Sequence, residues 1–504
     1  MAENTQNRLV SLDVFRGMTI AGMVLVNNPG GSPVYWPLDH AEWHGLTPTD
    51  WIFPFFLFIV GVSISISLGK SVRTANDSGR VTASKNTYRK IFTRAASIYL
   101  LGAALSIIPF FQFQATDAPD PIKLLVWLAF VASLFFLLLR NFKVAAVLFV
   151  VGLLGIAGMN LAGYNVVPYN YGTLRIFGVL QRIAVCYLIA SLIFLQTNWK
   201  QQVAIGVALL LGYWLIMTTI PVPGCEVTSL ADKACNLAAY LDRLILTENH
   251  IWRGGKVYDP EGILSTIPAI VTTISGVLTG TWLRSGSPPY EGGRAAASAD
   301  GVVLSSGSEK DGVDGIRDSS THTVPENHPV GEAPTPLLRK EGSLASPAYA
   351  GGSDPLNKVA GLFFFGITLL ALGLIWNSYF PMNKALWTSS YVLATTGLAL
   401  LVLGCCYWLI DIKGYKRWAW PFVVFGVNAM PLFVFSGFWA RMHAAYRVTG
   451  PEGTPISAQK WVMVHIFNPI FNPIDASLAF AISFILLWLF LMWLLYRKKI
   501  YVKV

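Results

Sequence analysis

Charged residues are scarce in this sequence of 504 residues: Asp, Glu, Lys and Arg make up only 13% of it, while 54% of it is hydrophobic. A soluble chain carries roughly 25% charged residues, so the shortage excludes an ordinary soluble protein of this length. The hydrophobic residues gather in blocks of roughly 20, the length that a helix needs to cross a bilayer. The composition therefore predicts a polytopic membrane protein.

The hydrophobic blocks also lack the two-residue alternation of an outer-membrane barrel, and an open sheet cannot exist in hydrocarbon. The sequence therefore predicts an all-α protein with about 12 transmembrane helices. No small-residue cleavage pattern follows Arg8, so we expect no cleaved signal peptide. The spans are expected near residues 10–28, 50–69, 91–110, 123–139, 144–161, 175–195, 202–220, 262–283, 357–377, 387–410, 421–440 and 475–496.

Lysine and arginine are absent from the loop 29–49, whereas the loop 70–90 and the C-terminal tail are rich in them. Basic loops stay on the cytoplasmic side, so both termini should be cytoplasmic and the loop 29–49 should face outward. The net charge of +10 is explained by these basic loops lying beside anionic lipid. The scattered basic residues give no indication of nucleic-acid binding.

Cysteine is also scarce, with five residues in the chain. Cys186, Cys405 and Cys406 lie inside predicted spans, where they serve as apolar filler. Cys225 and Cys235 share a predicted outward loop, and whether they form a disulfide stays open, because spacing alone does not show that the side chains meet. No His or Cys partner stands nearby at zinc-ligand spacing, so we expect no metal.

Residues 284–355 are rich in Gly, Ser, Pro, Asp and Glu and contain almost no aromatic residues. Such a composition cannot bury a core, and it predicts a disordered cytoplasmic linker. The linker divides the bundle into an N-terminal part, 1–283, and a C-terminal part, 356–504.

Some polar residues fall inside or beside the predicted spans. Asp13 and Arg16, three residues apart on one helical face, suit either an interfacial ion pair or a site for an anionic ligand. Gln181 and Arg182 lie about two turns into the sixth span, and an intramembrane arginine usually faces the bundle interior or a wet cavity.

Other polar residues collect at the outer ends of spans. Asp259 and Glu261 at the start of the eighth span could merely complement the helix dipole. Asn383 and Lys384 occupy an outer turn, where capping explains part of the pattern, and Asn428 could join two helices. A wet path through the bundle fits either a transporter or an enzyme that works across the membrane, and composition does not choose between them.

The stretch "RLVSLDVFRGMTIAGMVLVNN" (8–28), followed by "LDHAEWHGLTPTDWIFPFFLFIVGVSI" (38–64), resembles the start of the catalytic membrane domain of heparan-α-glucosaminide N-acetyltransferases and their bacterial relatives. The resemblance continues in matching order through "LRIFGVLQRIAVCYLIA", "NLAAYLDRLIL", "YDPEGILSTIPAIVTTISGVLTG" and "FPMNKALWTSSYVLATTGLAL". It covers most of the chain.

The resemblance implies transfer of acetyl from cytosolic acetyl-CoA to the amine of a glucosamine on the far side of the membrane. The family's catalytic histidine stands in an H-A-x-W-x-G-L-T motif, which here matches "HAEWHGLT" and selects His40. The family commonly has asparagine where this chain has His44. The family's asparagine after the first span corresponds to Asn27.

A glucosamine ammonium must lose a proton before it attacks a thioester, and histidine is a suitable base. His40 could alternatively carry the acetyl group itself, and the sequence leaves both routes open. Asn27 could orient the imidazole or stabilise the oxyanion. The CoA phosphates need basic partners at the cytoplasmic side, which makes Arg16 and Arg182 candidates, with Gln181 next to Arg182. The residues expected to bind the acceptor are Trp43, Asp50, Asp259, Glu261 and Asn383.

The chain departs from the eukaryotic enzymes: it has no extra luminal N-terminal region, and it carries an additional hairpin of spans and the linker 284–355. A bacterial inner-membrane enzyme that acts on glucosamine-type sugars suits it better than one that acts on heparan. The expected partners are acetyl-CoA, an amino sugar and membrane lipid, and the oligomeric state stays open. The competing functions are an amino-sugar transporter and an acyltransferase to a cell-envelope hydroxyl.

Overall fold

The computed structural model describes residues 9–69, 84–284, 354–451 and 453–502. The predicted linker lies outside these residues, apart from its two ends. The described chain is largely helical. Its one named sheet is a hairpin of β1 (Arg447–Thr449) and β2 (Pro455–Ser457), antiparallel with Val448 opposite Ile456.

Eleven helices in the described part of the chain are long and apolar enough to cross a membrane. A twelfth span is a bent pair, α12 (Trp420–Val427) and α13 (Ala429–Ala445), with 83° between its halves. The predicted all-α architecture is thus confirmed. The eleven helices are α1 (Val10–Asn27), α2 (Ile52–Leu68, with a preceding 3₁₀ turn Pro48–Trp51), α3 (Lys85–Ile107), α4 (Asp120–Leu138), α5 (Phe142–Leu161), α6 (Val179–Gln196), α7 (Trp199–Thr219), α9 (Thr266–Arg284), α10 (Pro355–Trp376), α11 (Ser389–Cys406, continued to Ile412 by a π-helical turn) and α15 (Pro473–Arg497).

Shorter helices lie in the connections. They are α8 (Leu237–Leu246), α14 (Ala458–Val462), the 3₁₀ turns Trp36–Leu38, Tyr171–Thr173 and Glu248–His250, and a π-helical turn Met463–Phe467.

Glycines let the helices that position the site approach closely. A Cβ atom on Gly61 of α2 would lie 1.9 Å from the carbonyl oxygen of Thr273 in α9, and one on Gly276 of α9 would lie 2.0 Å from that of Phe58. Only glycine permits such backbone contact between neighbouring helices in a membrane. The α2–α9 pair is therefore a close-packed unit, and it holds the N-terminal ends of both helices together.

The break between α12 and α13 is filled by the C-terminal tail. Asn428 lies at the break, where its Nδ2 donates to the carbonyl of Ile500 at 3.1 Å and its Oδ1 accepts from the amide of Val502 at 3.1 Å. The sequence suggested a helix-packing role for this asparagine. The structure shows instead that it joins a broken helix to the chain that follows α15.

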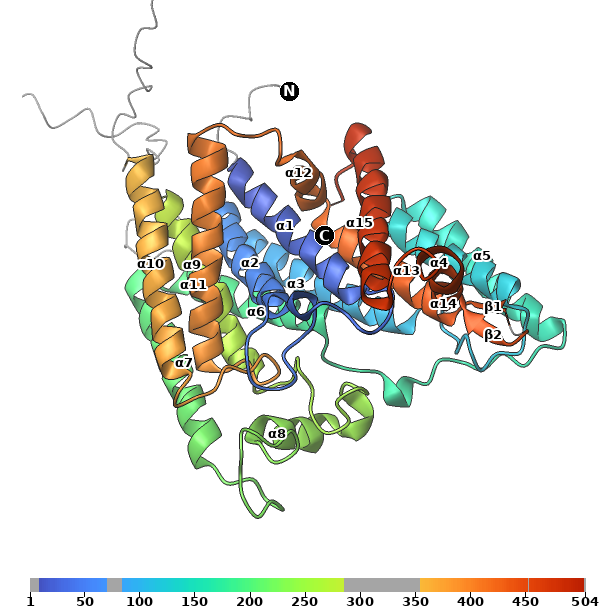
Figure 1. The fold of residues 1–504 in the computed structure, drawn as a ribbon, viewed down its shortest axis with the longest axis horizontal. Coiled ribbons are helices and arrows are strands. Elements are labelled where there is room, and N and C mark those ends of the chain that lie inside the picture. Colours follow the sequence, from blue (N-terminus) through green and yellow to red (C-terminus); the bar gives the residue numbers. More distant parts are fainter. Residues whose placement is uncertain (1–8, 70–83, 285–353, 452, 503–504) are drawn as a thin grey trace, which may run out of the picture. The chain divides into compact units, whose positions relative to one another are not determined.

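The candidate site lies at one end of the bundle, which we call the motif end. It is the end where α1 and α10 finish and where α2, α6, α9 and α11 begin. The loop 28–51, the segment 220–265 with α8, and the turn 377–388 meet there (Figure 1).

Candidate active site

The loop between α1 and α2 is shaped around Asp50. Proline stands at the first position of the turn Pro48–Trp51, and Thr47 and Asp50 form a capping box at its start. The carboxylate Oδ2 of Asp50 accepts hydrogen bonds from the amides of Ala41 (3.1 Å) and Thr47 (3.2 Å). These bonds close the loop on itself, so that Asp50 faces the residues before it rather than solvent.

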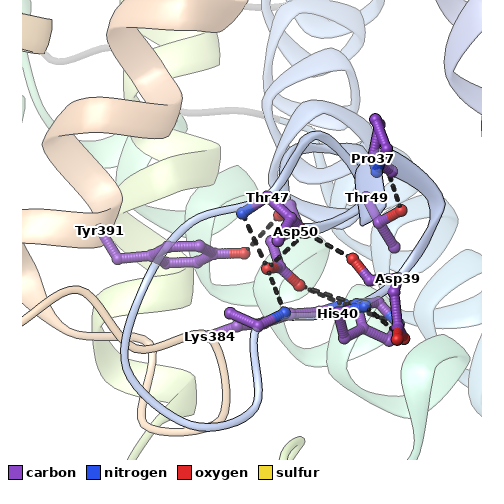
Figure 2. Close-up of polar contacts among 9 residues, drawn as sticks. Pro37, Asp39, His40, Thr47, Thr49, Asp50, Lys384 and Tyr391 are labelled. Atoms are coloured by element: carbon purple, nitrogen blue, oxygen red, sulfur yellow. Dashed lines mark hydrogen bonds and ion pairs between the residues drawn. The ribbon is translucent and has the colours of Figure 1, made fainter. Parts of the chain in front are cut away.

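His40 is held by that same carboxylate. Its Nδ1 lies 2.7 Å from Oδ1 of Asp50, whose side chain is 1% exposed, whereas the side chain of His40 is 49% exposed (Figure 2). A carboxylate accepts the hydrogen from Nδ1, which leaves the lone pair on Nε2. The arrangement of a buried acid and a half-exposed imidazole is that of a general base with a fixed tautomer.

Lys384 reaches the same pair from the turn between α10 and α11. Its Nζ lies 3.4 Å from Oδ1 of Asp50, 3.0 Å from Nδ1 of His40 and 3.4 Å from Nε2 of His40 (Figure 2). Burial lowers the pKa of Lys384, while the charge of Asp50 raises it. His40, Asp50 and Lys384 form a three-residue cluster, which we call the His40 cluster.

Further contacts fix the two segments that carry the His40 cluster. The amide of Gly45 donates to the carbonyl of Met382 at 2.9 Å, and the Tyr391 hydroxyl donates to the backbone carbonyl of Asp50 at 2.6 Å. The buried Asn383 places its Nδ2 3.4 Å from Nδ1 of His44. His44, which departs from the family motif, thus packs against a residue that the sequence predicted to bind the acceptor, and partial burial lowers its pKa.

Trp43 connects the loop 28–51 to the segment 220–265 through two contacts. Its Nε1 donates to the carbonyl of Leu230 at 2.8 Å, and its ring meets Tyr258 edge-on at 5.0 Å between centroids. Leu230 lies between Cys225 and Cys235, which form a disulfide. The structure thereby answers a question that the sequence left open, and it places a cross-linked loop against the HAEWHGLT motif.

Asp259 and Glu261 lie at the motif end, as the sequence suggested, but they already have a cationic partner. Arg175, just before α6, donates from Nε to Asp259 Oδ2 at 2.9 Å and also pairs with Glu261. These carboxylates raise the pKa of Arg175 against the opposing effect of its burial. Arg175 was not predicted from the sequence, where the signal for it is a basic residue at the expected start of a span.

Replacing Arg175 with methionine is expected to destabilise the protein by about 2–4 kcal/mol, because it leaves Asp259 and Glu261 buried without their counter-charge. The partial exposure of Arg175 (26%) keeps the cost at or below that of breaking a fully buried pair. Thermal unfolding of the purified variant measures it. Arg253→Met, which changes an exposed arginine nearby, is the matched control, and equal melting temperatures for the two variants would contradict the assignment.

Asp242 in α8 is a second buried acid at this end. Its Oδ1 accepts from the amide of Ile263 at 2.9 Å, and burial raises its pKa to about 6. The folded state therefore binds this proton more tightly than the unfolded chain, so the stability that the group contributes at low pH is lost as pH rises toward and past 6.

Asp242→Asn removes that ionisation while keeping the hydrogen-bond acceptor. The melting temperature of the variant relative to wild type is expected to be higher at pH 8 than at pH 5. Thermal unfolding at the two pH values tests this, and the same difference at both would show that Asp242 is not the titrating group.

Arg182 and Gln181 lie in the first turn of α6, at the motif end. Arg182 is fully buried, donates from Nη2 to the carbonyl of Gly262 at 3.2 Å, and stacks its guanidinium over the ring of Trp387 at 5.0 Å. Gln181 packs against Gly102 of α3, where an added Cβ would lie 2.6 Å from its Oε1. Both side chains are buried in the bundle, as expected, but they lie in the first turn of α6 rather than about two turns into the span, and at the motif end rather than at the opposite end, where the sequence predicted the partners of the CoA phosphates.

Arg16 and Asn27, both in α1, have no described contact with the His40 cluster. Arg16 forms the ion pair with Asp13 that the spacing suggested, at 3.6 Å, and its Nη1 donates to the carbonyl of Gly426 at 3.3 Å. Asn27 is exposed at the last residue of the helix. The structure thus brings together His40 and Asp50, and it leaves Arg16 and Asn27 apart from them.

Comparisons with known proteins find similarity to one class of membrane enzyme, and the matched region includes the His40 loop. A family model described as "Heparan-alpha-glucosaminide N-acetyltransferase, catalytic" matches residues 8–163, which include α1, His40 and Asp50. The human heparan-α-glucosaminide N-acetyltransferase is 25% identical over 541 aligned positions, which cover 99% of this chain and 60% of the relative. The mouse protein of the same name is 24% identical over 475 positions, which cover 86% of this chain and 53% of the relative.

The chain is therefore similar to the heparan-α-glucosaminide N-acetyltransferases, most directly over residues 8–163. It spans only about half to three fifths of the length of these two relatives. Together with the helices described above, this similarity supports a multi-pass membrane protein. The family match contains the motif loop, so His40 and Asp50 lie in the part of the chain where the likeness is recognised directly.

Proposed function

We propose that the protein transfers the acetyl group of acetyl-CoA to the amine of a glucosamine-type sugar, with the donor entering from the cytoplasm and the acceptor from the opposite side of a bacterial inner membrane. The observation that carries this proposal is His40, held through Nδ1 by the buried Asp50. Similarity to proteins named as acetyltransferases supports the reaction type. The disulfide supports placing the motif end outside the cytoplasm, because such bonds persist in oxidising compartments.

In the proposed reaction, Nε2 of His40 takes a proton from the acceptor ammonium, and the free amine then attacks the thioester carbon. Asp50 keeps the imidazole in the tautomer that leaves Nε2 available, and it stabilises the imidazolium that forms. When the C–S bond breaks, the CoA thiolate takes the proton from His40, and the freed Nε2 then takes the second proton from the new amide nitrogen and passes it to solvent. An acetyl-histidine intermediate is the alternative route through the same nitrogen.

The acceptor is proposed to lie on the outer face of the His40 cluster, against Trp43 and near Asn383. The half-buried ring of Trp43 offers an aromatic surface for a sugar. Asp259 and Glu261 shape this side of the site rather than neutralising an ammonium directly, because Arg175 already balances them, and Asp259 Oδ2 also accepts from the amide of Trp252 at 2.9 Å.

The donor is proposed to pass along α1 and α6. Arg16 suits the CoA phosphates, since it lies between the start of α1 and the motif end. Arg182 and Gln181 lie close to the site and suit the acyl end of the donor. Asn27 remains a proposed catalytic residue on the basis of the family resemblance alone.

The test is acetyl transfer by the purified protein in detergent, with acetyl-CoA and glucosamine. Free CoA thiol and N-acetylglucosamine should appear in equal amounts. Release of CoA thiol with glucose in place of glucosamine would favour the hydroxyl acyltransferase. If no CoA thiol were released with either sugar, acetyl transfer would be contradicted.

A further inference from the structure

Lys384 is a basic residue within the His40 cluster to which the proposed function gives no role. It comes from the turn between α10 and α11, more than 300 residues from His40 along the chain. Its side chain is 26% exposed, so the ammonium is partly withdrawn from water yet accessible from the site. A lysine that only solubilised the surface would not direct Nζ at a buried carboxylate and both nitrogens of an imidazole.

The geometry points to Lys384 as a further catalytic residue, whose ammonium stabilises the negative charge that develops on the thioester oxygen during acetyl transfer. This inference rests on the proposed function and adds a residue to it. Asn27, expected either to orient the imidazole or to stabilise the oxyanion, is exposed at the end of α1 and has no described contact with the His40 cluster.

The charges of the His40 cluster support the assignment. Before the reaction, the carboxylate of Asp50 and the ammonium of Lys384 cancel beside a neutral imidazole. When His40 takes the acceptor's proton, the cluster becomes singly positive at the moment when the thioester oxygen becomes negative. Without Lys384, the imidazolium would be cancelled by Asp50 and no charged group of the cluster would stabilise the oxyanion, which is costly where water is partly excluded.

The ammonium also has donors to spare. It carries three N–H groups, of which one is used toward Asp50. Because Nζ lies 3.4 Å from Nε2 of His40, an acyl group brought next to Nε2 has its oxygen within reach of the flexible lysine side chain. Lys384 leaves Nε2 when the acceptor amine enters and turns to the acyl oxygen while it keeps its contact with Asp50.

The step balances with Lys384 acting only as a hydrogen-bond donor. The amine nitrogen forms a bond to the carbonyl carbon, and the carbonyl electron pair moves to oxygen beside Lys384. The pair then returns as the C–S bond breaks, and the thiolate leaves with the proton held by His40. The attacking nitrogen then gives up its remaining extra proton through the freed His40 to solvent, so that Lys384 begins and ends as an ammonium and the products are an amide, CoA thiol and one proton.

Lys384→Met, which keeps most of the length of the side chain and removes its charge, tests the inference. The expected result is a fall in kcat of about 10²- to 10³-fold with a much smaller change in KM for acceptor and donor, because the lost interaction is made only in the transition state. Lys384→Arg should retain part of kcat. Lys460→Met, at an exposed lysine on α14, is the matched control and should behave as wild type. Unchanged kcat in Lys384→Met, or a rise in KM alone, would overturn the assignment.

Chemical rescue separates charge from structure. In a Cys405→Ser background, which removes the exposed free thiol while Cys186 and Cys406 stay buried, Lys384→Cys is alkylated with 2-bromoethylamine to restore an ammonium at nearly the original length. Turnover should return by at least 10-fold, whereas alkylation with iodoacetamide should restore none. Equal results with the two reagents would overturn the role.

The wild-type protein in the same assay tests the proposed function itself. If wild type shows no turnover, both proposals fail. If wild type turns over, the variants test the role of Lys384 alone.

Discussion

Replacing His40 with alanine is expected to lower the turnover of acetyl transfer by about 10²- to 10⁴-fold, because the acceptor ammonium then has no positioned base. The contact of His40 with Asp50 supports this expectation independently of the sequence motif. The imidazole is fixed by a 2.7 Å contact to a carboxylate that is 1% exposed, so its Nε2 is presented in one orientation. Product formation from acetyl-CoA and glucosamine, followed by mass spectrometry, measures the loss.

The variant should remain folded, since the side chain of His40 is about half exposed and fills no core. Its melting temperature and its elution in size-exclusion chromatography should match those of wild type. His465→Ala is the matched control, because His465 is an exposed histidine that stacks on Trp461 in the connection before α15. Full turnover in His40→Ala would remove His40 from the mechanism, whichever route the acetyl group takes.

Asp50→Asn is expected to lower kcat by about 10²- to 10⁴-fold, although the Asp50 side chain is only 1% exposed. Asparagine keeps the size of the side chain but removes the charge that stabilises the imidazolium. It can also present its amide to Nδ1, which would place the hydrogen on Nε2 and remove the base. Steady-state kinetics over a range of pH measures the effect, with KM expected to change much less than kcat.

A structural role for Asp50 makes a different prediction. Its Oδ2 closes the loop through Ala41 and Thr47, and the asparagine side-chain oxygen can still accept from one of those amides. The fold should therefore survive, and the melting temperature checks that it does. Glu42→Gln, at an exposed carboxylate of the same loop, is the control. If Asp50→Asn kept its kcat and lost only stability, Asp50 would be a loop residue and not part of the base.

The fold could be predicted from the sequence because the length of an apolar block is a local property. Each predicted span has a counterpart in the structure. The end points differ by up to six residues, as at α3, which begins at Lys85 rather than near residue 91. The 83° break at Asn428 was not predictable, because it depends on the backbone of Ile500 and Val502, more than 70 residues away.

The candidate site was only partly predictable for the same reason. The resemblance selected His40, and a Thr-x-x-Asp capping pattern ten residues later was present as a local signal for Asp50. From the sequence, Asp50 was predicted to bind the acceptor, because nothing local shows that its carboxylate turns back to His40. Lys384 and Arg175 act through partners 344 and 84 residues away, and only the packing of the helices brings those groups together.

The most direct test of the account is acetyl transfer in sealed proteoliposomes of known orientation. Acetyl-CoA is supplied on the side of the C-terminal tail and glucosamine on the side of the HAEWHGLT loop, with wild type and His40→Ala compared. The account predicts N-acetylglucosamine on the glucosamine side, in an amount equal to the CoA thiol released on the other side, and with wild type only. Intact glucosamine crossing the membrane without thiol release would contradict it and would make the protein a transporter.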